Sequence, residues 1–358
     1  MYNDGKESGG LLSAVIPYYN GYDFVFNMVA DLLRIRLLKE IIIVDDGSPD
    51  NRTNVLRKAF QEEKKISIYR KDNGGIADAR NFGMGLATGQ FILFVDQDDK
   101  IVPETVDETL RIMRDHNSDC ALWSTKRVYD KGIIKALCCV KSDCIVDERI
   151  IRNDFIRALV FYKPNDWITC ARHVWGGVYK LTFLKENRIK FKKFVNYEDD
   201  LVFTLLVFLN SSSISLSKKT GYYWNIRGTS YSHTLRYICD LANKYEQLYV
   251  YICKKLREYN ISEEITRDFE RLSMQQIPVR DIYNRCINHE TIMSICHATR
   301  SLMVKGREKY KYNDPCAQDN RYYKVAYYLL RYRMYWGAVL LCKYMYYKNS
   351  RIGKTKSE

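Results

Sequence analysis

Three aspartates that follow a short apolar run are the residues of this sequence best suited to metal or phosphate chemistry. The run is Phe91–Val95, and Asp96, Asp98 and Asp99 come directly after it. Five consecutive apolar residues, rich in aromatic and β-branched types, predict a buried strand of a parallel sheet. Because ligands of open α/β sheets bind outside the carboxyl ends of the strands, we expect these acids at the mouth of a site. A divalent cation with phosphate ligands would relieve the repulsion between them.

Two earlier apolar runs, residues 11–16 and 40–44, also end in polar groups. The first leads into Asn20 and the second into Asp46. Runs of this kind alternate with amphipathic helical patterns and short loops, which predicts a doubly wound, mostly parallel α/β sheet flanked by helices. Each acid alone could be a turn residue or a helix N-cap. The sheet would nevertheless deliver Asp46 and Asp98 to the same edge.

A third acidic group precedes the apolar helical run 201–209 and consists of Glu198, Asp199 and Asp200. Capping of the helix N-terminus could explain one or two of these acids. The same position favours the ionised form of a carboxylate, which is the form that a general base requires.

In this order, the segments resemble the inverting, GT-A fold glycosyltransferases of family 2, of the bacterial surface-polysaccharide type. The matching segments are Val15–Asn20, Ile43–Ser48, Asn73-x-Gly75, Ala79-Arg80-Asn81-x-Gly83, Ala87-x-Gly89 and Asp96-x-Asp98-Asp99. A DxD pair alone occurs often by chance, whereas the ordered set over roughly the first hundred residues is specific.

The resemblance implies a nucleotide-diphosphate sugar donor, a UDP-sugar above all, with Mn²⁺ or Mg²⁺ on the diphosphate. Asp46 would contact uracil, Asp96 the ribose and Asp98 the metal, and Asp99 could share either of the last two tasks. Arg80 would lie near the diphosphate or the donor sugar, although a solvated helix face or a structural ion pair explains it equally well. The expected nucleotide-sugar contacts are Pro17, Tyr19, Asn20, Asp46, Asn73, Gly75, Arg80, Asp96 and Gln97.

The resemblance also implies an acceptor half. Inverting transfer needs a base that deprotonates the acceptor hydroxyl, and the matching motif assigns this role to Asp199, with Glu198 second. Trp175, beside Gly176, could stack on a sugar or lie in a tightly packed turn. The expected contacts to acceptor or diphosphate are Trp175, Gly176, Asp200 and Arg227, and the expected metal ligands are Asp98, Asp99 and His233. A lone histidine such as His233 could equally be a surface or packed residue.

The length of 358 residues suits an α/β domain with a smaller appendage. We expect a GT-A domain over residues 1–236, with a donor half of about 11–102 and an acceptor half of about 103–236. Residues 237–358 are expected to form a mainly helical region.

The formal net charge of +14 is concentrated at the end of the chain. From Ser301 onward, thirteen basic residues face four acidic ones, and tyrosines are interleaved with the bases from Arg321 to Lys348. This composition could form an interfacial helix on an anionic membrane or an aromatic packing face with a basic rim. It also suits single-stranded nucleic acid, but because no RNA-binding motif accompanies it, no nucleic-acid partner is expected.

Eleven cysteines without a C-x-x-C pair, and an N-terminus without an apolar export signal, predict reduced thiols in a cytoplasmic protein. A peripheral position on the inner face of the cytoplasmic membrane is compatible with the basic region.

The sequence thus predicts an inverting, metal-assisted glycosyltransferase that acts on a saccharide or lipid-linked saccharide acceptor in cell-surface polysaccharide biosynthesis. A metal-dependent nucleotidyltransferase is one alternative, but the glycine-rich phosphate loop expected after its first strand is missing. A non-catalytic sugar- or nucleotide-binding protein is another, although it would not need both Asp98 and Asp199.

Overall fold

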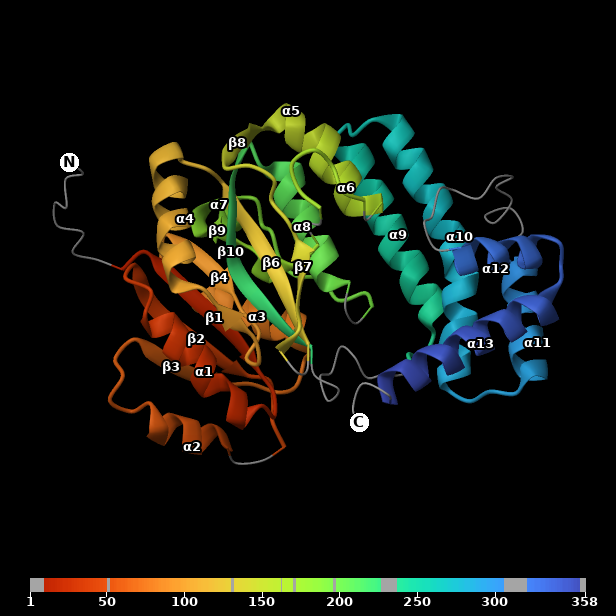
Figure 1. Cartoon of the computed structure of the whole chain (residues 1–358), viewed down its shortest axis with the longest axis horizontal. Coiled ribbons are helices and arrows are strands. Elements are labelled where there is room, and N and C mark those ends of the chain that lie inside the picture. The colour runs from red at the N-terminus through yellow and green to blue at the C-terminus, as the bar shows by residue number, and fades with distance from the viewer. Residues whose placement is uncertain are drawn as a thin grey trace. The chain divides into compact units, whose positions relative to one another are not determined.

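The computed structural model describes residues 10–49, 52–129, 132–161, 163–169, 172–195, 198–226, 237–305 and 321–354 (Figure 1). These residues fall into two compact units. The first comprises residues up to 193 together with 198–226, and the second comprises 194–195 and the residues from 237 onward.

The first unit is built on one sheet. Its strands, in chain order, are β1 (Leu12–Tyr18), β2 (Leu38–Asp45), β3 (Ile66–Arg70), β4 (Phe91–Phe94), β5 (Lys100–Ile101), β6 (Cys120–Tyr129), β7 (Ile134–Cys138), β8 (Cys144–Asp147), β9 (Gly177–Lys180) and β10 (Ser213–Ile226). Their order across the sheet is β3-β2-β1-β4-β9-β6-β10-β5, with β7 beside β6 and β8 beside β10.

Strands β3, β2, β1 and β4 are all parallel, which confirms the predicted doubly wound arrangement of this half. The other half is mixed, because β9 runs antiparallel to both β4 and β6 whereas β10 runs parallel to β6. The carboxyl ends of β1, β2 and β4 therefore meet at one edge, where the predicted donor site lies.

Helices cover this sheet. They are α1 (Tyr22–Leu33), α2 (Arg52–Ala59), α3 (Ile76–Leu86), α4 (Pro103–His116), α5 (Glu148–Ile150), α6 (Ile156–Phe161), α7 (Leu181–Glu186) and α8 (Asp199–Asn210), with a π-helical turn at Ile151–Phe155 and a 3-10 turn at Val174–Gly176. Helix α1 ends at Leu33, before the chain reaches β2. The reason is that the N–H groups of Arg36 and Leu37 donate to the Asp107 carboxylate, at 3.0 Å each, instead of to helical carbonyls.

Helix α3 packs unusually closely on the sheet, and a glycine permits this. A Cβ added to Gly83 would lie 2.5 Å from Val15 Cγ1 in β1 and 3.3 Å from Val44 Cγ2 in β2. A larger residue would lift the helix from the strands. Gly83 therefore sets the depth at which α3 carries its other residues, Arg80 included.

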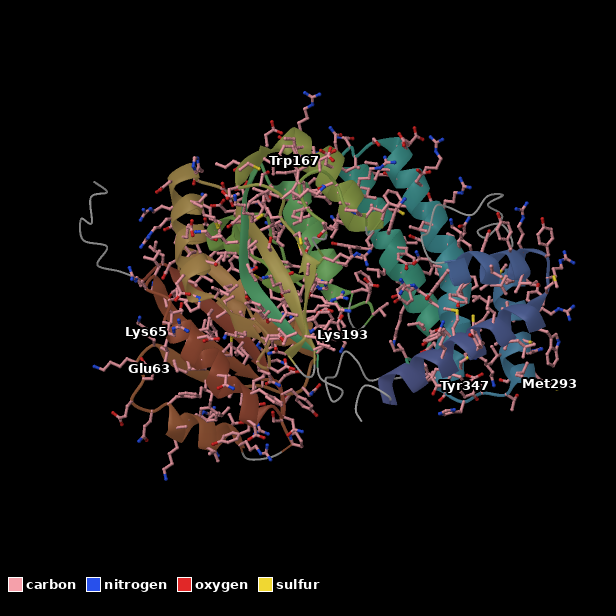
Figure 2. All side chains as sticks on the ribbon, in the orientation of Figure 1. Glu63, Lys65, Trp167, Lys193, Met293 and Tyr347 are labelled. Carbon is pink, nitrogen blue, oxygen red and sulfur yellow. The ribbon has the colours of Figure 1, made fainter. Side chains whose placement is uncertain are left out.

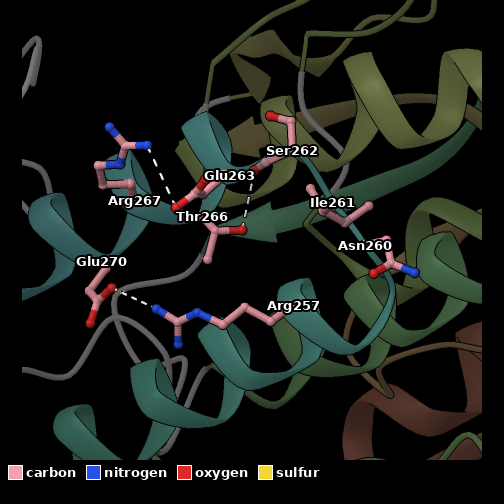
Figure 3. Close-up of a pocket in the computed structure, with 8 residues that line it drawn as sticks. All are labelled: Arg257, Asn260, Ile261, Ser262, Glu263, Thr266, Arg267 and Glu270. Atoms are coloured by element: carbon pink, nitrogen blue, oxygen red, sulfur yellow. Dashed lines mark hydrogen bonds and ion pairs between the residues drawn. The ribbon is translucent and has the colours of Figure 1, made fainter.

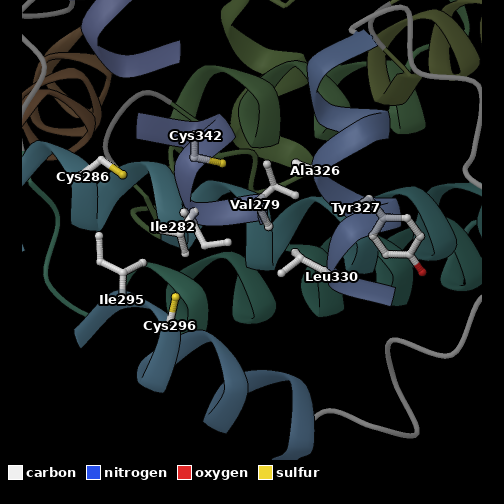
Figure 4. Close-up of a cluster of buried hydrophobic side chains, with 11 residues drawn as sticks. Val279, Ile282, Cys286, Ile295, Cys296, Ala326, Tyr327, Leu330 and Cys342 are labelled. Carbon is white, nitrogen blue, oxygen red and sulfur yellow. The ribbon is translucent and has the colours of Figure 1, made fainter. Parts of the chain in front are cut away.

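The second unit is helical, as predicted. Its helices are α9 (Leu241–Glu258), α10 (Glu263–Ile287), α11 (Ile292–Lys305), α12 (Arg321–Arg331) and α13 (Tyr335–Lys354). The Ser262 hydroxyl caps α10 by accepting from the Ile265 N–H at 3.2 Å. A buried cluster from α10 to α13 forms its core, with Ile282, Leu330 and Val339 among its members (Figure 4).

A hollow of about 450 Å³ lies at the turn between α9 and α10 (Figure 3). Its charged walls are paired, since Arg257 lies 2.8 Å from Glu270 and Arg267 lies 3.8 Å from Glu263. It contains none of the residues predicted for donor or acceptor binding. Among the helices that the structure describes, none combines the length and the apolar composition needed to cross a bilayer.

Candidate active site

The Asp46 carboxylate, just after β2, fixes the loop that leads into α3. Its oxygens accept hydrogen bonds from the N–H groups of Gly74 (2.9 Å) and Gly75 (2.7 Å) and from Lys71 Nζ (2.9 Å). Gly75 has a φ of 90°, in the region that favours glycine. Asp46 is therefore next to Asn73 and Gly75, as predicted, and its role in this structure is to hold their loop.

The ends of β1, β2 and β4 are tied together by the predicted donor residues. Gln97 pairs with the Tyr19 backbone, accepting from its N–H at 3.3 Å and donating to its carbonyl at 3.2 Å. The Asn20 N–H donates to Ser48 Oγ at 3.0 Å. Pro17 lies in β1 opposite Val44. The structure thus brings Pro17, Tyr19, Asn20 and Gln97 to one sheet edge.

Arg80 connects the acids of the two halves. One of its terminal nitrogens donates to Asp96 at 2.8 Å, and the other donates to Asp200 at 2.6 Å and lies 3.7 Å from Asp199 Oδ2. The guanidinium is buried and also lies over the Phe191 ring, 5.4 Å from its centroid. The solvated helix face expected as one alternative for Arg80 is thus wrong, whereas the structural ion pair, the other alternative, matches its contacts. The carboxylates of both halves surround this one cation.

This cluster perturbs the titration of its members. Burial raises the pKa of Asp199 to about 6; the Asp200 charge adds to the shift and Arg80 opposes it. Burial likewise raises the pKa of Asp96, against the effect of Arg80. The surrounding carboxylates raise the pKa of Arg80 despite its burial, so that it remains charged. Asp199 is therefore an acid poised to exchange a proton near neutral pH.

The acids at the start of α8 are not helix caps. Glu198 is the N-cap residue of α8 but makes no side-chain capping bond. Its carboxylate lies 3.7 Å from Arg172. Asp200 reaches the other way and accepts from the Val174 N–H at 3.2 Å. Asp199 Oδ2 makes no hydrogen bond with any described residue.

Asp99 holds strand β10. Its two oxygens accept from the Tyr222 hydroxyl at 2.7 Å and from the Asn225 N–H at 2.8 Å. Burial, with the charges of Asp96 and Asp98, raises the pKa of Asp99 well above its usual value. In this structure Asp99 therefore holds β10, and its expected part in binding the metal or the ribose stays a prediction. Asp98 is partly exposed and fits a hard cation as an oxygen ligand.

A complete metal site is not assembled by the described part of the chain, where no group of three His, Cys, Asp or Glu side chains is arranged to hold a metal ion. His233, the predicted third ligand, and Arg227 lie outside the described residues.

Trp175 is a packed residue. Its ring stacks on the His173 ring, with centroids 4.5 Å apart and an interplanar angle of 3°. It also stacks on the Tyr222 ring, with centroids 4.6 Å apart and an interplanar angle of 13°. We therefore correct the expectation that Trp175 stacks on a sugar, because both of its faces are covered. Gly176 beside it has open space where a Cβ would stand.

Sequence reasoning missed His173 and Tyr222. Burial lowers the pKa of His173 to about 4, so its imidazole is neutral, and its Nε2 makes no hydrogen bond with the described residues. The Tyr222 hydroxyl accepts from the Asp96 N–H at 3.1 Å and donates to Asp99. Strand alternation from Tyr222 to Trp224 was the available signal, since it places both side chains on one face.

Comparisons with known proteins show similarity to glycosyltransferases. Residues 13–138 match the model of the glycosyl transferase family 2. The chain is 26% identical over 216 residues to the poly(ribitol-phosphate) beta-N-acetylglucosaminyltransferase TarS of Staphylococcus aureus (strain MW2), covering 59% of this chain and 35% of TarS. It is 27% identical over 297 residues to the uncharacterized glycosyltransferase YibD of Escherichia coli (strain K12), and this match covers 81% of this chain and 79% of YibD.

The crystal structure of S. aureus TarS 1–349 in complex with UDP-GlcNAc superposes with a TM-score of 0.60 at 19% identity, over 94% of this chain and 92% of that one. The fold is thus that of the GT-A glycosyltransferases. Its similarity to glycosyltransferase family 2 lies in residues 13–138, which match the family model. It spans about a third of the full length of TarS, since the match covers 35% of that relative.

Proposed function

We propose that this protein transfers a sugar, with inversion, from a nucleotide-diphosphate sugar to a hydroxyl of a saccharide or lipid-linked saccharide. The observation that carries the proposal is the Arg80 bridge, which links Asp96 at the donor edge to Asp199 and Asp200. A UDP-sugar is the favoured donor, because the TarS fragment superposed above was crystallised with UDP-GlcNAc.

In this proposal Asp199 is the general base. Its pKa of about 6 leaves it ionised at neutral pH yet basic enough to accept the acceptor's proton. The base acts on the face of the sugar opposite the departing diphosphate, which gives inversion. Arg80 holds the base and the donor edge in one geometry, and near-attack geometry of this kind supplies much of the rate enhancement of two-substrate enzymes.

Mn²⁺ or Mg²⁺ is the proposed cofactor, and Asp98 is the described residue that would hold it together with oxygens of the donor diphosphate. Such a cation would neutralise the charge that develops on the leaving group.

A role in cell-surface polysaccharide biosynthesis follows from the relatives, among which TarS is named for transfer to poly(ribitol phosphate). The proposed place of action is the cytoplasm, with peripheral attachment to the inner face of the membrane through the second unit. Exposed aromatic side chains support this attachment, since Tyr332 is 67% exposed, Tyr344 56% and Tyr347 56%. Tyr347 is labelled in Figure 2. Unchanged co-sedimentation with anionic liposomes after deletion of the residues beyond Arg321 would refute it.

A screen of UDP- and GDP-sugars tests the proposed reaction. Each is assayed with and without Mn²⁺ for hydrolysis and for thermal stabilisation, because a true donor raises stability in proportion to its saturation. Release of pyrophosphate from a nucleoside triphosphate would favour a nucleotidyltransferase instead. Stabilisation by sugars without any turnover would favour a non-catalytic binding protein.

A further inference from the structure

Arg127, near the end of β6, is a half-buried cation without a described partner. Its Nε is buried and makes no hydrogen bond with any described residue, and no described carboxylate forms an ion pair with it. Its guanidinium makes a cation–π contact with Trp224, with Cζ 5.4 Å from the ring centroid. A contact of this kind contributes about 0.5–2 kcal/mol and leaves the Nε–H donor without an acceptor.

A second cation stands directly across the strand pair. Lys135 of β7 is the antiparallel partner of Arg127, and directly opposite residues place their side chains on the same face. Like charges in this arrangement destabilise a sheet. Lys135 Nζ lies 5.6 Å from the Tyr129 ring centroid and forms no ion pair with the described residues. The pair thus concentrates positive charge at one place.

This place adjoins the candidate active site. Arg127 is paired with Trp224 in the register of β6 and β10. The centroid of the Trp224 ring lies 6.0 Å from that of His173 and 6.1 Å from that of Trp175. Trp175 in turn stacks on Tyr222. The Tyr222 hydroxyl donates a hydrogen bond to Asp99. In the sheet β6 lies two strands from β4, on the side away from β1 and β2, and Arg127 stands well beyond the level of Phe94, on the order of 20 Å from the end of β4.

From this geometry we propose that Arg127 and Lys135, with Trp224 beside them, bind an anionic group of the acceptor, either a phosphate or a carboxylate. The assignment rests on the proposed function, since it names the class of acceptor. The position beyond β9 separates these cations from the donor edge at β1, β2 and β4. A guanidinium can form paired hydrogen bonds with planar or tetrahedral anions, and at Arg127 such bonds would orient the acceptor toward Asp199.

The test uses probes that differ by one charge. These are sn-glycerol 3-phosphate with glycerol, and methyl β-glucuronide with methyl β-glucoside. Binding is measured by calorimetry on the full chain, with and without saturating UDP. We expect the wild type to bind at least one anionic probe about tenfold or more tightly than its neutral counterpart. Arg127→Gln and Lys135→Gln should each remove most of this preference and leave UDP affinity unchanged.

Lys126→Gln is the matched control, because Lys126 neighbours Arg127 but points to the opposite face, toward Tyr223 at 5.9 Å. Its preference should equal that of the wild type. Equal binding of charged and neutral probes by the wild type would overturn the proposal. It would also be overturned if the Lys126 and Arg127 variants lost the preference for the anionic probe to the same extent.

Failure of the proposed glycosyl transfer would be seen differently, as the absence of UDP binding and of UDP-sugar hydrolysis in the wild type. A preference for the phosphate or for the glucuronide identifies the source of the anion.

Discussion

The guanidinium of Arg80 in α3 donates a 2.6 Å hydrogen bond to Asp200 at the start of α8, 120 residues further along the chain. The bond joins a helix of the donor half to the helix that carries the proposed base. Arg80 also donates to Asp96. The relative positions of donor edge and base therefore depend on one side chain.

Replacement of Arg80 by Gln should destabilise the protein by about 3–5 kcal/mol, because it leaves several buried or half-buried carboxylates without their cation. Urea denaturation at pH 7.5 measures this loss. Arg80→Lys keeps the positive charge, but a single ammonium group cannot reach Asp96 and Asp200 at once as the two guanidinium nitrogens do. This variant should lose transfer activity and lose less stability than Arg80→Gln. Arg111→Gln, on the exposed side of α4, is the control and should change neither quantity. An Arg80→Gln variant as stable as this control would contradict the bridging role.

Asp199→Asn should abolish sugar transfer while retaining UDP binding, because the amide cannot accept the acceptor's proton. A loss of about 10²–10⁴-fold in kcat is expected for removal of a general base. In the wild type, kcat/KM should fall as pH decreases through about 6, where Asp199 becomes protonated. Full activity in the Asn variant, or a flat profile between pH 5 and 7, would refute the assignment.

The same substitution should raise stability at pH 7.5. The native pKa of Asp199, about 6, lies above the usual value of 3.8, so the native state binds its proton more tightly than the unfolded state. Ionisation in the native state therefore costs free energy, up to about 3 kcal/mol above pH 6. The cost disappears as pH falls toward 4. Urea midpoints of wild type and variant should consequently differ at pH 7.5 and converge near pH 4.

Two glycines of α3 should respond to alanine in opposite directions. The added Cβ at Gly83 would meet Val15 at 2.5 Å, so Gly83→Ala should cost about 1–3 kcal/mol and lower activity by displacing Arg80. At Gly85 no heavy atom lies within 4 Å of the added Cβ. Gly85→Ala should therefore stabilise the protein by roughly 0.5–1 kcal/mol. Thermal unfolding of the two variants is the measurement, and equal shifts would show that α3 does not rest on Gly83.

Asp98→Ala should abolish metal-dependent turnover of the nucleotide sugar, since Asp98 is the described carboxylate proposed to hold the cation. Turnover with Mn²⁺, and after removal of metal with EDTA, is the measurement. Asp99→Asn, by comparison, should act mainly on stability, because it weakens the bonds to Tyr222 and Asn225. Wild-type turnover that survives EDTA would remove the metal from the mechanism.

Local patterns were sufficient for most of the fold. The helix predicted over the apolar run 201–209 is present and extends from Asp199 to Asn210. Parallel strands with helical crossovers follow from periodicity and short loops. The antiparallel β9 was not predicted, because its four residues, Gly177–Lys180, are too few to show an alternating pattern.

The candidate site was predictable only in part. Motif order indicated which acids gather, but not that Arg80 would be buried among them, since burial depends on the close packing of α3 through Gly83. The roles of Asp99 and Trp175 could not be inferred, because their partner Tyr222 is distant in sequence. The unpaired charge of Arg127 is likewise a property of strand register, which a single sequence does not specify.

The attachment of β10 to the aspartate segment after β4 has a consequence for folding order. Tyr222 and Asn225 make hydrogen bonds to Asp96, Asp98 and Asp99 across sequence separations of 126, 127 and 123 residues. Contacts of such range form late in folding, because the long loop must close first. During synthesis, the donor edge would therefore stay immature until β10 has left the ribosome. A fragment that ends at α8 would contain every predicted donor residue and yet lack the strand that sets the aspartates in place.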